Sequence, residues 1–226
     1  MRRAVVLAAL AAAPAALAQA PAPPAPTPAP VPVPVNPCDD AAQRLKCPDL
    51  TMPAPSDLHL RRSGSGRRQL LQATNRLVNV GDGPMEVRGR RTGSRVMGEV
   101  TQVIDTTGST RRRFESSGRL RFTFIPGQYG YWKYENAAYF ELWELDRSGA
   151  RVRRAELGPK QNYCLRDYEK VRAYAVRLGY GACKQNPRLN SVKLGTSRGW
   201  SDTYFYGYAG SNHIDVTGLR GCYAFD

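Results

Sequence analysis

The sequence predicts an all-β fold, an antiparallel β-sandwich with long loops and at most short helices. Through residues 37–226 no helical period of apolar residues is found, and short apolar or alternating runs are separated by Gly, Pro, Asn and Asp. Several short strands at such spacing are typical of a β-sandwich. Removal of the first 36 residues leaves 226 − 36 = 190 residues, a length that suits one domain with one core.

Six segments carry the strand pattern. They lie near residues 68–80, 84–89, 96–105, 119–125, 139–146 and 151–157. In the fourth segment Leu120, Phe122 and Phe124 would share one face, because side chains alternate along a strand. The turn signals Asp-Thr-Thr-Gly at 105–108 and Asp-Arg-Ser-Gly at 146–149 follow two of the segments. The second turn predicts a hairpin between the last two segments.

Two further segments could form short helices. One covers residues 39–45, just before Pro48, and the other covers residues 166–177. Both are short, so the predicted fold class stays all-β.

The first 18 residues have the composition of a secretory signal peptide. Arg2 and Arg3 precede an apolar Ala/Val/Leu run that ends in Ala16-Leu17-Ala18. A membrane-spanning helix is the alternative, but the run is short, is broken by Pro14, and no later segment approaches the roughly 20 apolar residues that a span needs. We therefore expect a secreted or periplasmic cell-envelope protein with no transmembrane segment.

Residues 19–36 form a Pro/Ala-rich linker. From residue 21 to residue 37 Pro alternates with Ala and Val, a composition that favours extended polyproline conformation and semi-rigid spacers. The folded domain is expected to span residues 37–226.

Five cysteines in an exported protein indicate cross-links more than reactive thiols. Cys38 and Cys47 are close in sequence and are expected to pair at the start of the domain. Metal binding is the competing use, but the chain has no Cys-x-x-Cys spacing and offers only His59 and His213 to complete a site. A structural zinc site is therefore not expected.

The chain is strongly basic. Its formal charge is +14, and removal of Arg2 and Arg3 with the signal peptide leaves 14 − 2 = +12. Export removes the protein from most nucleic acid, so we expect anionic cell-envelope polymers or lipid headgroups as partners, and no nucleic acid. A solvated basic surface that merely follows the composition is the alternative. The arginine clusters are Arg88, Arg90 and Arg91; Arg111, Arg112 and Arg113; and Arg151, Arg153 and Arg154.

Four motifs follow one another along the chain. They are Val-Asn-Val-Gly-Asp-Gly-Pro-Met-Glu-Val at 78–87, the aromatic strand at 124–146, Gly-Pro-Lys-Gln-Asn-Tyr-Cys-Leu-Arg-Asp at 158–167, and Gly-Thr-Ser-Arg-Gly-Trp-Ser-Asp-Thr-Tyr at 195–204, which Ile-Asp-Val-Thr-Gly-Leu follows at 214–219. Glycine and proline in the first motif suit a tight reversal of the chain. In order and spacing, the four motifs resemble the lysyl oxidase (protein-lysine 6-oxidase) family over about residue 48 to the end. That family oxidises lysine side chains to aldehydes with copper, oxygen and a lysine-tyrosylquinone.

The aromatic strand lacks the copper ligands of the family. Tyr129, Tyr131 and Lys133 occupy the alternate positions where the family has three histidines. Tyrosine and lysine have reference pKa values of about 10 and 10.4, so deprotonating each at neutral pH costs roughly 4 to 5 kcal/mol. Three imidazoles suit copper far better. The resemblance thus implies a degenerate copper site and no bound copper.

The quinone precursors of the family match Lys160 and Tyr204. The alternative function that the resemblance implies is a copper-dependent amine oxidase, in which these two residues form the lysine-tyrosylquinone and Tyr129, Tyr131 and Lys133 hold a metal. Without the copper histidines, Lys160 would be an ordinary turn lysine and Tyr204 a packed aromatic.

The resemblance also bears on the remaining cysteines and on the end of the chain. Cys164 and Cys183 flank a loop that cysteines also span in lysyl oxidases, so they are expected to pair, and Cys222 is left over. After the turn at 214–219 the family continues into another strand, whereas Gly221-Cys-Tyr-Ala-Phe-Asp226 begins one and stops. The domain is therefore expected to be truncated at its C-terminus; the alternative is a sheet that lacks most of one element and exposes an edge.

Taken together, these observations predict an exported lysyl oxidase-like domain without amine oxidase activity. Such a domain would act as a binding or structural protein of the cell envelope.

Overall fold

The computed structural model describes residues 36–55, 57–208 and 212–225. They belong to one compact unit, Asn36–Asp226. The signal peptide predicted over residues 1–18 and nearly all of the linker predicted over residues 19–36 lie outside the described residues. In the described part of the chain, no helix is long and apolar enough to cross a membrane.

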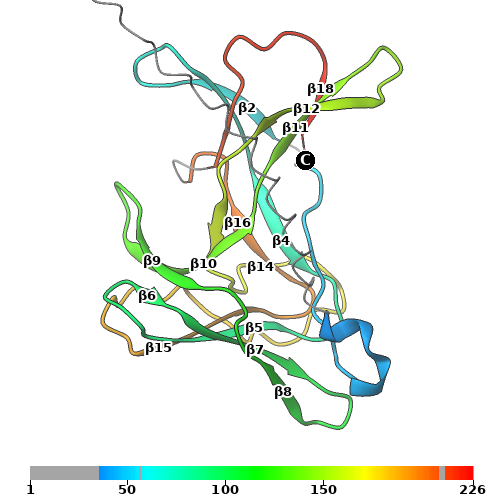
Figure 1. The fold of residues 1–226 in the computed structure, drawn as a ribbon, viewed down its shortest axis with the longest axis vertical. Coiled ribbons are helices and arrows are strands. Elements are labelled where there is room, and N and C mark those ends of the chain that lie inside the picture. The colour runs from blue at the N-terminus through cyan, green and yellow to red at the C-terminus, as the bar shows by residue number, and fades with distance from the viewer. Residues whose placement is uncertain (1–35, 56, 209–211, 226) are drawn as a thin grey trace, which may run out of the picture. The chain divides into compact units, whose positions relative to one another are not determined.

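The described residues are almost entirely strands and loops, as expected for an all-β fold (Figure 1). Two short 3-10 helices, η1 (Pro37–Asp39) and η2 (Ala41–Gln43), come first. The strands are β1 (Leu50–Thr51), β2 (Leu58–Arg62), β3 (Gln69–Ala73), β4 (Asn75–Asn79), β5 (Met85–Arg90), β6 (Val96–Met97), β7 (Glu99–Asp105), β8 (Arg111–Phe114), β9 (Leu120–Phe124), β10 (Gly130–Ala138), β11 (Glu141–Leu145), β12 (Arg151–Leu157), β13 (Gln161–Tyr163), β14 (Glu169–Lys170), β15 (Ser191–Thr196), β16 (Trp200–Tyr204), β17 (Ile214–Asp215) and β18 (Tyr223–Phe225).

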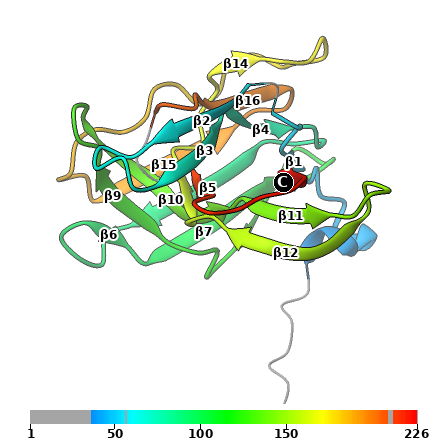
Figure 2. The ribbon, with the colours of Figure 1, turned by 90° about the horizontal axis from the view of Figure 1, so that it is seen from above.

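The strands form small antiparallel sheets. Their orders are β1-β4-β16-β14, β13-β10-β9-β6, β12-β11-β18, β15-β5-β7-β8 and β17-β3-β2. Figure 2 shows several of these sheets from above, with β11 and β12 on one side of the unit and β2 and β3 on the other.

The main core is shared by three sheets. Its apolar side chains come from the sheets β1-β4-β16-β14, β13-β10-β9-β6 and β15-β5-β7-β8. Burying each Leu- or Val-sized side chain contributes about 1.5 to 3 kcal/mol, so this cluster holds the three sheets together. Its buried members are Leu77, Val87, Met97, Val100, Leu120, Trp132, Tyr163, Leu165, Val192, Leu194 and Tyr204.

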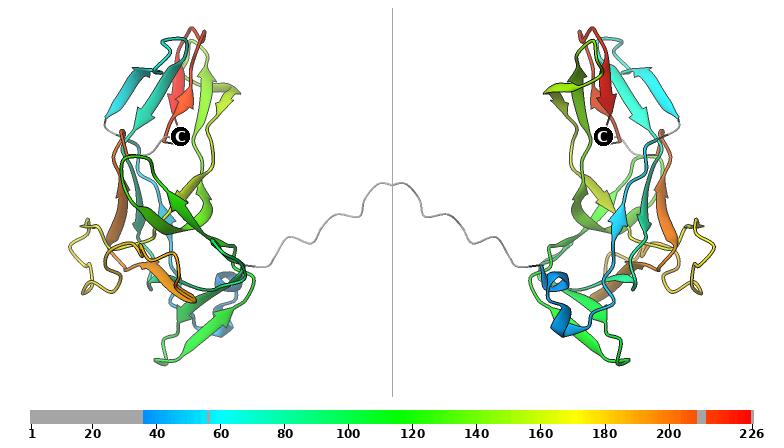
Figure 3. Two further views of the ribbon diagram at one scale, coloured as in Figure 1. Left: turned by 90° about the vertical axis from the view of Figure 1, so that its left-hand side faces the viewer. Right: turned by 90° about the vertical axis from the view of Figure 1, so that its right-hand side faces the viewer.

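A second, smaller core joins two other sheets. Phe140, Leu142 and Ile214 are buried there, and partly buried Leu71 and Phe225 pack against them. The rings of Phe140 and Phe225 stack with centroids 5.1 Å apart. Figure 3 shows the two sheets facing each other, β2 and β3 on one side and β11, β12 and β18 on the other. These layers packed face to face agree with the predicted sandwich.

All six predicted strand segments contain strands, but two of them are divided. The segment at 68–80 becomes β3 and β4, which belong to different sheets. At the break, the N–H of Thr74 donates to the Asp57 carboxylate at 3.0 Å, so a side chain replaces the ladder partner. The segment at 96–105 is likewise divided at Gly98, whose N–H donates to the Thr92 hydroxyl at 2.8 Å.

The predicted hairpin at 146–149 is confirmed by the pairing of β11 with β12. The Asp146 carboxylate accepts hydrogen bonds from the N–H groups of Ser148 and Ala150, at 2.8 and 3.0 Å. Gly149 has a φ of 83°, a conformation that glycine adopts at little cost. These contacts fix the turn.

The helix predicted over residues 166–177 was wrong. This segment contains β14, which pairs with β16, and the N–H groups of Val171 and Arg172 donate to the carbonyl of Gly199 at 3.0 and 3.1 Å. Its backbone donors therefore bond to a distant segment rather than to the preceding turn. The helix predicted over residues 39–45 is present only as η1 and η2, and it ends at Arg44, where φ is 49°.

Both predicted disulfides are present. Cys38 is bonded to Cys47, with Cα atoms 6.0 Å apart, and Cys164 is bonded to Cys183, with Cα atoms 5.7 Å apart. Cys222 is exposed and unpaired among the described cysteines.

Candidate functional site

A lysine and a tyrosine from different sheets meet in the interior. Lys133 lies on β10 and Tyr204 on β16, and the Lys133 ammonium nitrogen is 4.8 Å from the centroid of the Tyr204 ring. The same nitrogen is 5.2 Å from the Tyr208 ring centroid. Lys133 is only 4% exposed. An ammonium over two aromatic faces is attracted by their electron density, by about 0.5 to 2 kcal/mol.

Asp202 supplies the negative charge of this site. The Asp202 side chain is 0% exposed, and its carboxylate accepts a hydrogen bond from the N–H of Leu165 at 3.0 Å. The guanidinium of Arg166 approaches its other oxygen at 3.6 Å. Among the described residues, this oxygen has no hydrogen-bond partner. A buried carboxylate that is only partly paired is costly, which perturbs the protonation of its neighbours.

Burial shifts the two charged groups toward their neutral forms. It raises the pKa of Asp202 to about 7, although Arg166 and Lys133 oppose the shift. It lowers the pKa of Lys133 to about 8, although the Asp202 charge opposes that shift. At neutral pH both groups are therefore near their titration points, which is unusual for lysine and aspartate.

This pair makes stability depend on pH. Folding raises the pKa of Asp202 from 3.8 to about 7, so the folded state binds more protons than the unfolded state between these values. Stability from protonated Asp202 is therefore lost as pH rises through that window. The side chain in Asp202→Asn cannot ionise. Subtracting the free energy of unfolding of this variant from that of the wild type therefore cancels, to first order, the contributions of the other titrating groups. We expect the wild-type free energy of unfolding, minus that of the variant, to fall from about pH 4 to about pH 7.

Urea unfolding of both proteins at stepwise pH measures this difference. A difference that rises over the same window would contradict the raised pKa of Asp202.

Tyr204 is fixed by further polar contacts. Its hydroxyl accepts a hydrogen bond from the N–H of Cys164 at 2.8 Å, next to the disulfide to Cys183. Its ring packs edge-on against Tyr163 and Tyr208, with centroids 4.6 and 4.9 Å away. Burial raises the pKa of Tyr204 well above its ordinary value. The hydroxyl is therefore a neutral acceptor with a structural partner.

The three positions that match the copper ligands of the lysyl oxidase family differ in burial. Tyr129 is 67% exposed and precedes β10, whereas Lys133 is buried against the Tyr204 ring. Tyr131 is half-buried and acts electrostatically on Tyr208. Only the third position therefore reaches the interior beside Tyr204, and it carries an ammonium.

The two predicted quinone precursors also differ in their surroundings. Lys160 is exposed just before β13, whereas Tyr204 is 7% exposed. Within the described residues, no hydrogen bond or ring contact joins them. The lysine whose ammonium lies over the Tyr204 ring is Lys133.

The residues at this site do not fit copper. Its potential donors are a lysine that is mostly protonated, the hydroxyls of Tyr163, Tyr204 and Tyr208, whose pKa values burial raises, and one carboxylate, Asp202. The two histidines lie elsewhere. His59, on β2, stacks on Tyr206 with ring centroids 3.7 Å apart, and His213 lies just before β17. Where the chain is described, no three His, Cys, Asp or Glu side chains cluster as metal ligands would.

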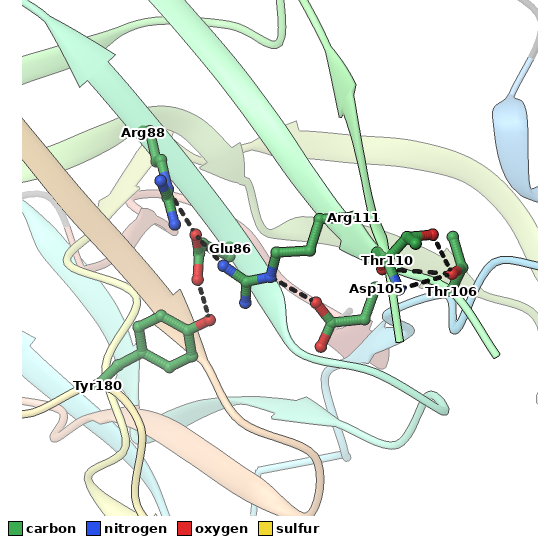
Figure 4. A network of polar contacts seen from close by, with 7 residues as sticks. All are labelled: Glu86, Arg88, Asp105, Thr106, Thr110, Arg111 and Tyr180. Atoms are coloured by element: carbon green, nitrogen blue, oxygen red, sulfur yellow. Dashed lines mark hydrogen bonds and ion pairs between the residues drawn. The ribbon is translucent and has the colours of Figure 1, made fainter. Parts of the chain in front are cut away.

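A polar network lies on the outer face of the sheet β15-β5-β7-β8 (Figure 4). Glu86 is 2% exposed and accepts hydrogen bonds from the Tyr180 hydroxyl at 2.6 Å and from Arg88 at 2.7 Å. Arg111 lies 3.6 Å from Glu86 and 2.8 Å from Asp105. Burial alone would raise the pKa of Glu86, but the hydrogen bonds from Tyr180 and Arg88 outweigh it and the pKa falls. This network fixes two arginines on the surface.

Sequence reasoning did not single out Asp202 and Arg166. Asp202 was detectable, because it lies two residues before Tyr204 and side chains two apart on a strand share a face. Arg166 gave no such signal, since it follows a disulfide cysteine in a loop whose path the sequence does not reveal.

Comparisons with protein-family models, with curated proteins and with solved structures found no match for this chain. Its function is therefore argued from the site and the surface described above.

Proposed function

We propose that this chain is an exported domain of the lysyl oxidase-like type that lacks amine oxidase activity. It serves as a binding protein of the cell envelope and is attracted by its basic surface to anionic polymers or lipid headgroups. One observation carries the proposal. Lys133 occupies a position where the resemblance implies a copper-binding histidine, and its ammonium lies over the Tyr204 ring.

The chemistry of Lys133 supports the loss of oxidase activity. A protonated lysine repels a metal cation, and with its pKa lowered to about 8 Lys133 is still mostly protonated at neutral pH. The adjacent Tyr204 hydroxyl is occupied by the N–H of Cys164. The site is thus filled by interactions within the chain.

The charge distribution supports binding to an anionic partner. Arg90 and Arg113 lie on an open sheet face, and their side chains have no hydrogen bond or ion pair within the described residues. Exposed cations that no carboxylate neutralises create a field that attracts polyanions.

The cysteines support export. Two disulfides are present among the described residues, and disulfides persist mainly in oxidising compartments.

Retention on immobilised polymers tests the binding proposal. We expect the exported chain to bind a sulfated or carboxylated polymer, or vesicles that contain anionic phospholipid, and not neutral dextran or phosphatidylcholine vesicles. Retention should weaken as salt rises, because the Debye length shrinks from about 10 Å at 0.1 M to about 3 Å at 1 M. Equal retention on neutral and anionic surfaces, or none on any anionic surface, would refute the proposal.

The amine oxidase alternative keeps one favourable observation. A lysine ammonium and a tyrosine ring lie together, as a lysine-tyrosine cofactor requires, although the pair is Lys133 with Tyr204 and not Lys160 with Tyr204. The donor set nevertheless does not fit copper, so no step through a metal is proposed.

A further inference from the structure

A basic depression lies on the outer face of the sheet β15-β5-β7-β8. Lys193, Arg88 and Thr101 lie side by side across three strands of this sheet, and Ser191 and Arg90 form the next row. The depression has a volume of about 450 Å³, within the range of pockets that hold small ligands. Its lining residues are Arg88, Gly89, Arg90, Thr101, Arg113, Ser191, Val192 and Lys193.

The lining contains four cations and no carboxylate. Arg88 is held by Glu86, and the Lys193 ammonium lies 5.3 Å from the Tyr180 ring centroid. Arg90 and Arg113 have no such partner in the described part of the chain, so their guanidinium groups are available to a ligand. Two carboxylates lie near the lining without being part of it: Glu99 lies opposite Arg90 on β7, and Glu115 accepts a hydrogen bond from the Thr101 hydroxyl at 2.8 Å.

A second depression continues the first. Its volume is about 490 Å³, and the two share Lys193 in their linings. Here the charges are mixed, because Glu86 and Asp105 neutralise Arg111, as Figure 4 shows. The two depressions together form a strip with one strongly cationic half and one half of mixed charges.

We propose that this strip binds an acidic glycan chain, with carboxylate or sulfate groups at Arg90 and Arg113. The sugar hydroxyls lie against Ser191 and the polar groups around Glu86. The inference rests on the proposed function, because it names the surface and the ligand class of that binding. Guanidinium groups bond carboxylate and sulfate-like oxyanions through two parallel N–H donors, which gives both strength and orientation.

The lining favours a glycan over a protein or a membrane. Protein interfaces centre on apolar and aromatic side chains that become buried on binding. The one branched aliphatic side chain that lines the first depression, Val192, is only 4% exposed and so offers little surface to a protein partner. Surfaces that anchor to a membrane bury apolar side chains at the lipid interface in addition to presenting cations. Hydroxyls and cations in a concave strip match a hydrophilic chain that carries separated charges.

Charge reversal at the free arginines tests the inference. The exported chain and its Arg90→Glu/Arg113→Glu variant are titrated with polygalacturonate, dextran sulfate and neutral dextran by biolayer interferometry. Each lost charge-assisted bond is strong, so we expect at least about tenfold weaker binding to one or both acidic glycans. Arg61→Glu/Arg62→Glu is the matched control, since it makes the same charge change on another exposed strand, and its affinity should stay within about twofold of wild type.

The outcomes separate the strip from the general proposal. Equal weakening by both double variants would overturn the strip as the site while leaving binding to anionic polymers in place. No binding of the wild-type chain to acidic glycans or anionic vesicles would refute the proposed function itself. Binding to anionic vesicles alone, unaffected by Arg90→Glu/Arg113→Glu, would overturn the glycan assignment. Should the charge-reversal variant fail to fold by circular dichroism, Arg90→Gln/Arg113→Gln takes its place, with Arg61→Gln/Arg62→Gln as its control.

Discussion

Trp132→Ala is expected to lower the free energy of unfolding by about 3 to 5 kcal/mol. Trp132 is 0% exposed and packs in the main core, with the Phe122 ring edge-on at 5.6 Å. Its indole N–H donates to the carbonyl of Asn186 at 2.9 Å. The variant leaves a cavity behind β10 and removes one of the two hydrogen bonds that the Asn186 carbonyl accepts, the other coming from the N–H of Leu189 at 3.5 Å. Since whole domains are stable by only about 5 to 15 kcal/mol, much of the stability is lost.

Two further variants separate packing from hydrogen bonding. Trp132→Phe keeps most of the volume and loses the bond to Asn186, so its cost should be nearer about 1 kcal/mol. Trp143→Ala changes a half-buried tryptophan on β11, where Arg151 covers the ring at 5.8 Å, and should cost less than Trp132→Ala. Urea unfolding of the oxidised chain measures all three. If Trp143→Ala costs more than Trp132→Ala, the position of the core is wrong.

Removing the disulfide between Cys164 and Cys183 should lower the free energy of unfolding by about 3 kcal/mol. The bond closes a loop with a sequence separation of 19 residues. Closing a loop of about that length in the unfolded chain costs entropy worth about 3 kcal/mol. Cys164 is also 1% exposed and donates its N–H to the Tyr204 hydroxyl. We expect Cys164→Ala/Cys183→Ala to loosen the loop from 165 to 182 and the surroundings of Tyr204 together.

Cys38→Ala/Cys47→Ala is the matched control. This bond spans 9 residues near the start of the domain, so its loss should cost less, since the entropy of loop closure grows with loop length. Thermal unfolding and protease sensitivity of the loop compare the two variants. Equal loop cleavage in both variants would contradict a special role for the bond between Cys164 and Cys183.

The strands were predictable because their signal is local. Alternation and turn residues located all six segments, and Asp146 fixed the hairpin between β11 and β12 through its own side chain. The division of two segments was not predictable, because it depends on partners such as Asp57 for Thr74, which lie 17 residues apart in sequence. The wrong helix at 166–177 has the same cause, since its N–H groups bond to the distant Gly199.

The face of a strand was predictable only where a second layer covers it. Leu120 is fully buried and Phe122 is partly buried, as alternation requires, but Phe124 is 64% exposed because β9 runs beyond the main core. Alternation fixes the direction of a side chain and says nothing about what lies opposite it.

The candidate site was predictable in its parts but not in its pairing. The sequence singled out Lys133 and Tyr204 separately, each by its match to a motif. Their contact depends on two sheets packing face to face, which no spacing in the sequence encodes. Asp202 and Arg166 complete the site through electrostatics that likewise arise only on folding.

The most direct test of the central proposal combines copper analysis with quinone staining. The purified chain is incubated with Cu(II) in air, freed of loosely bound metal, and analysed for copper content and for redox-cycling quinone, with Tyr204→Phe as the control. We expect far less than one copper per chain and no quinone signal that depends on Tyr204. Stoichiometric copper, together with a quinone signal that Tyr204→Phe abolishes, would contradict a binding domain without oxidase activity.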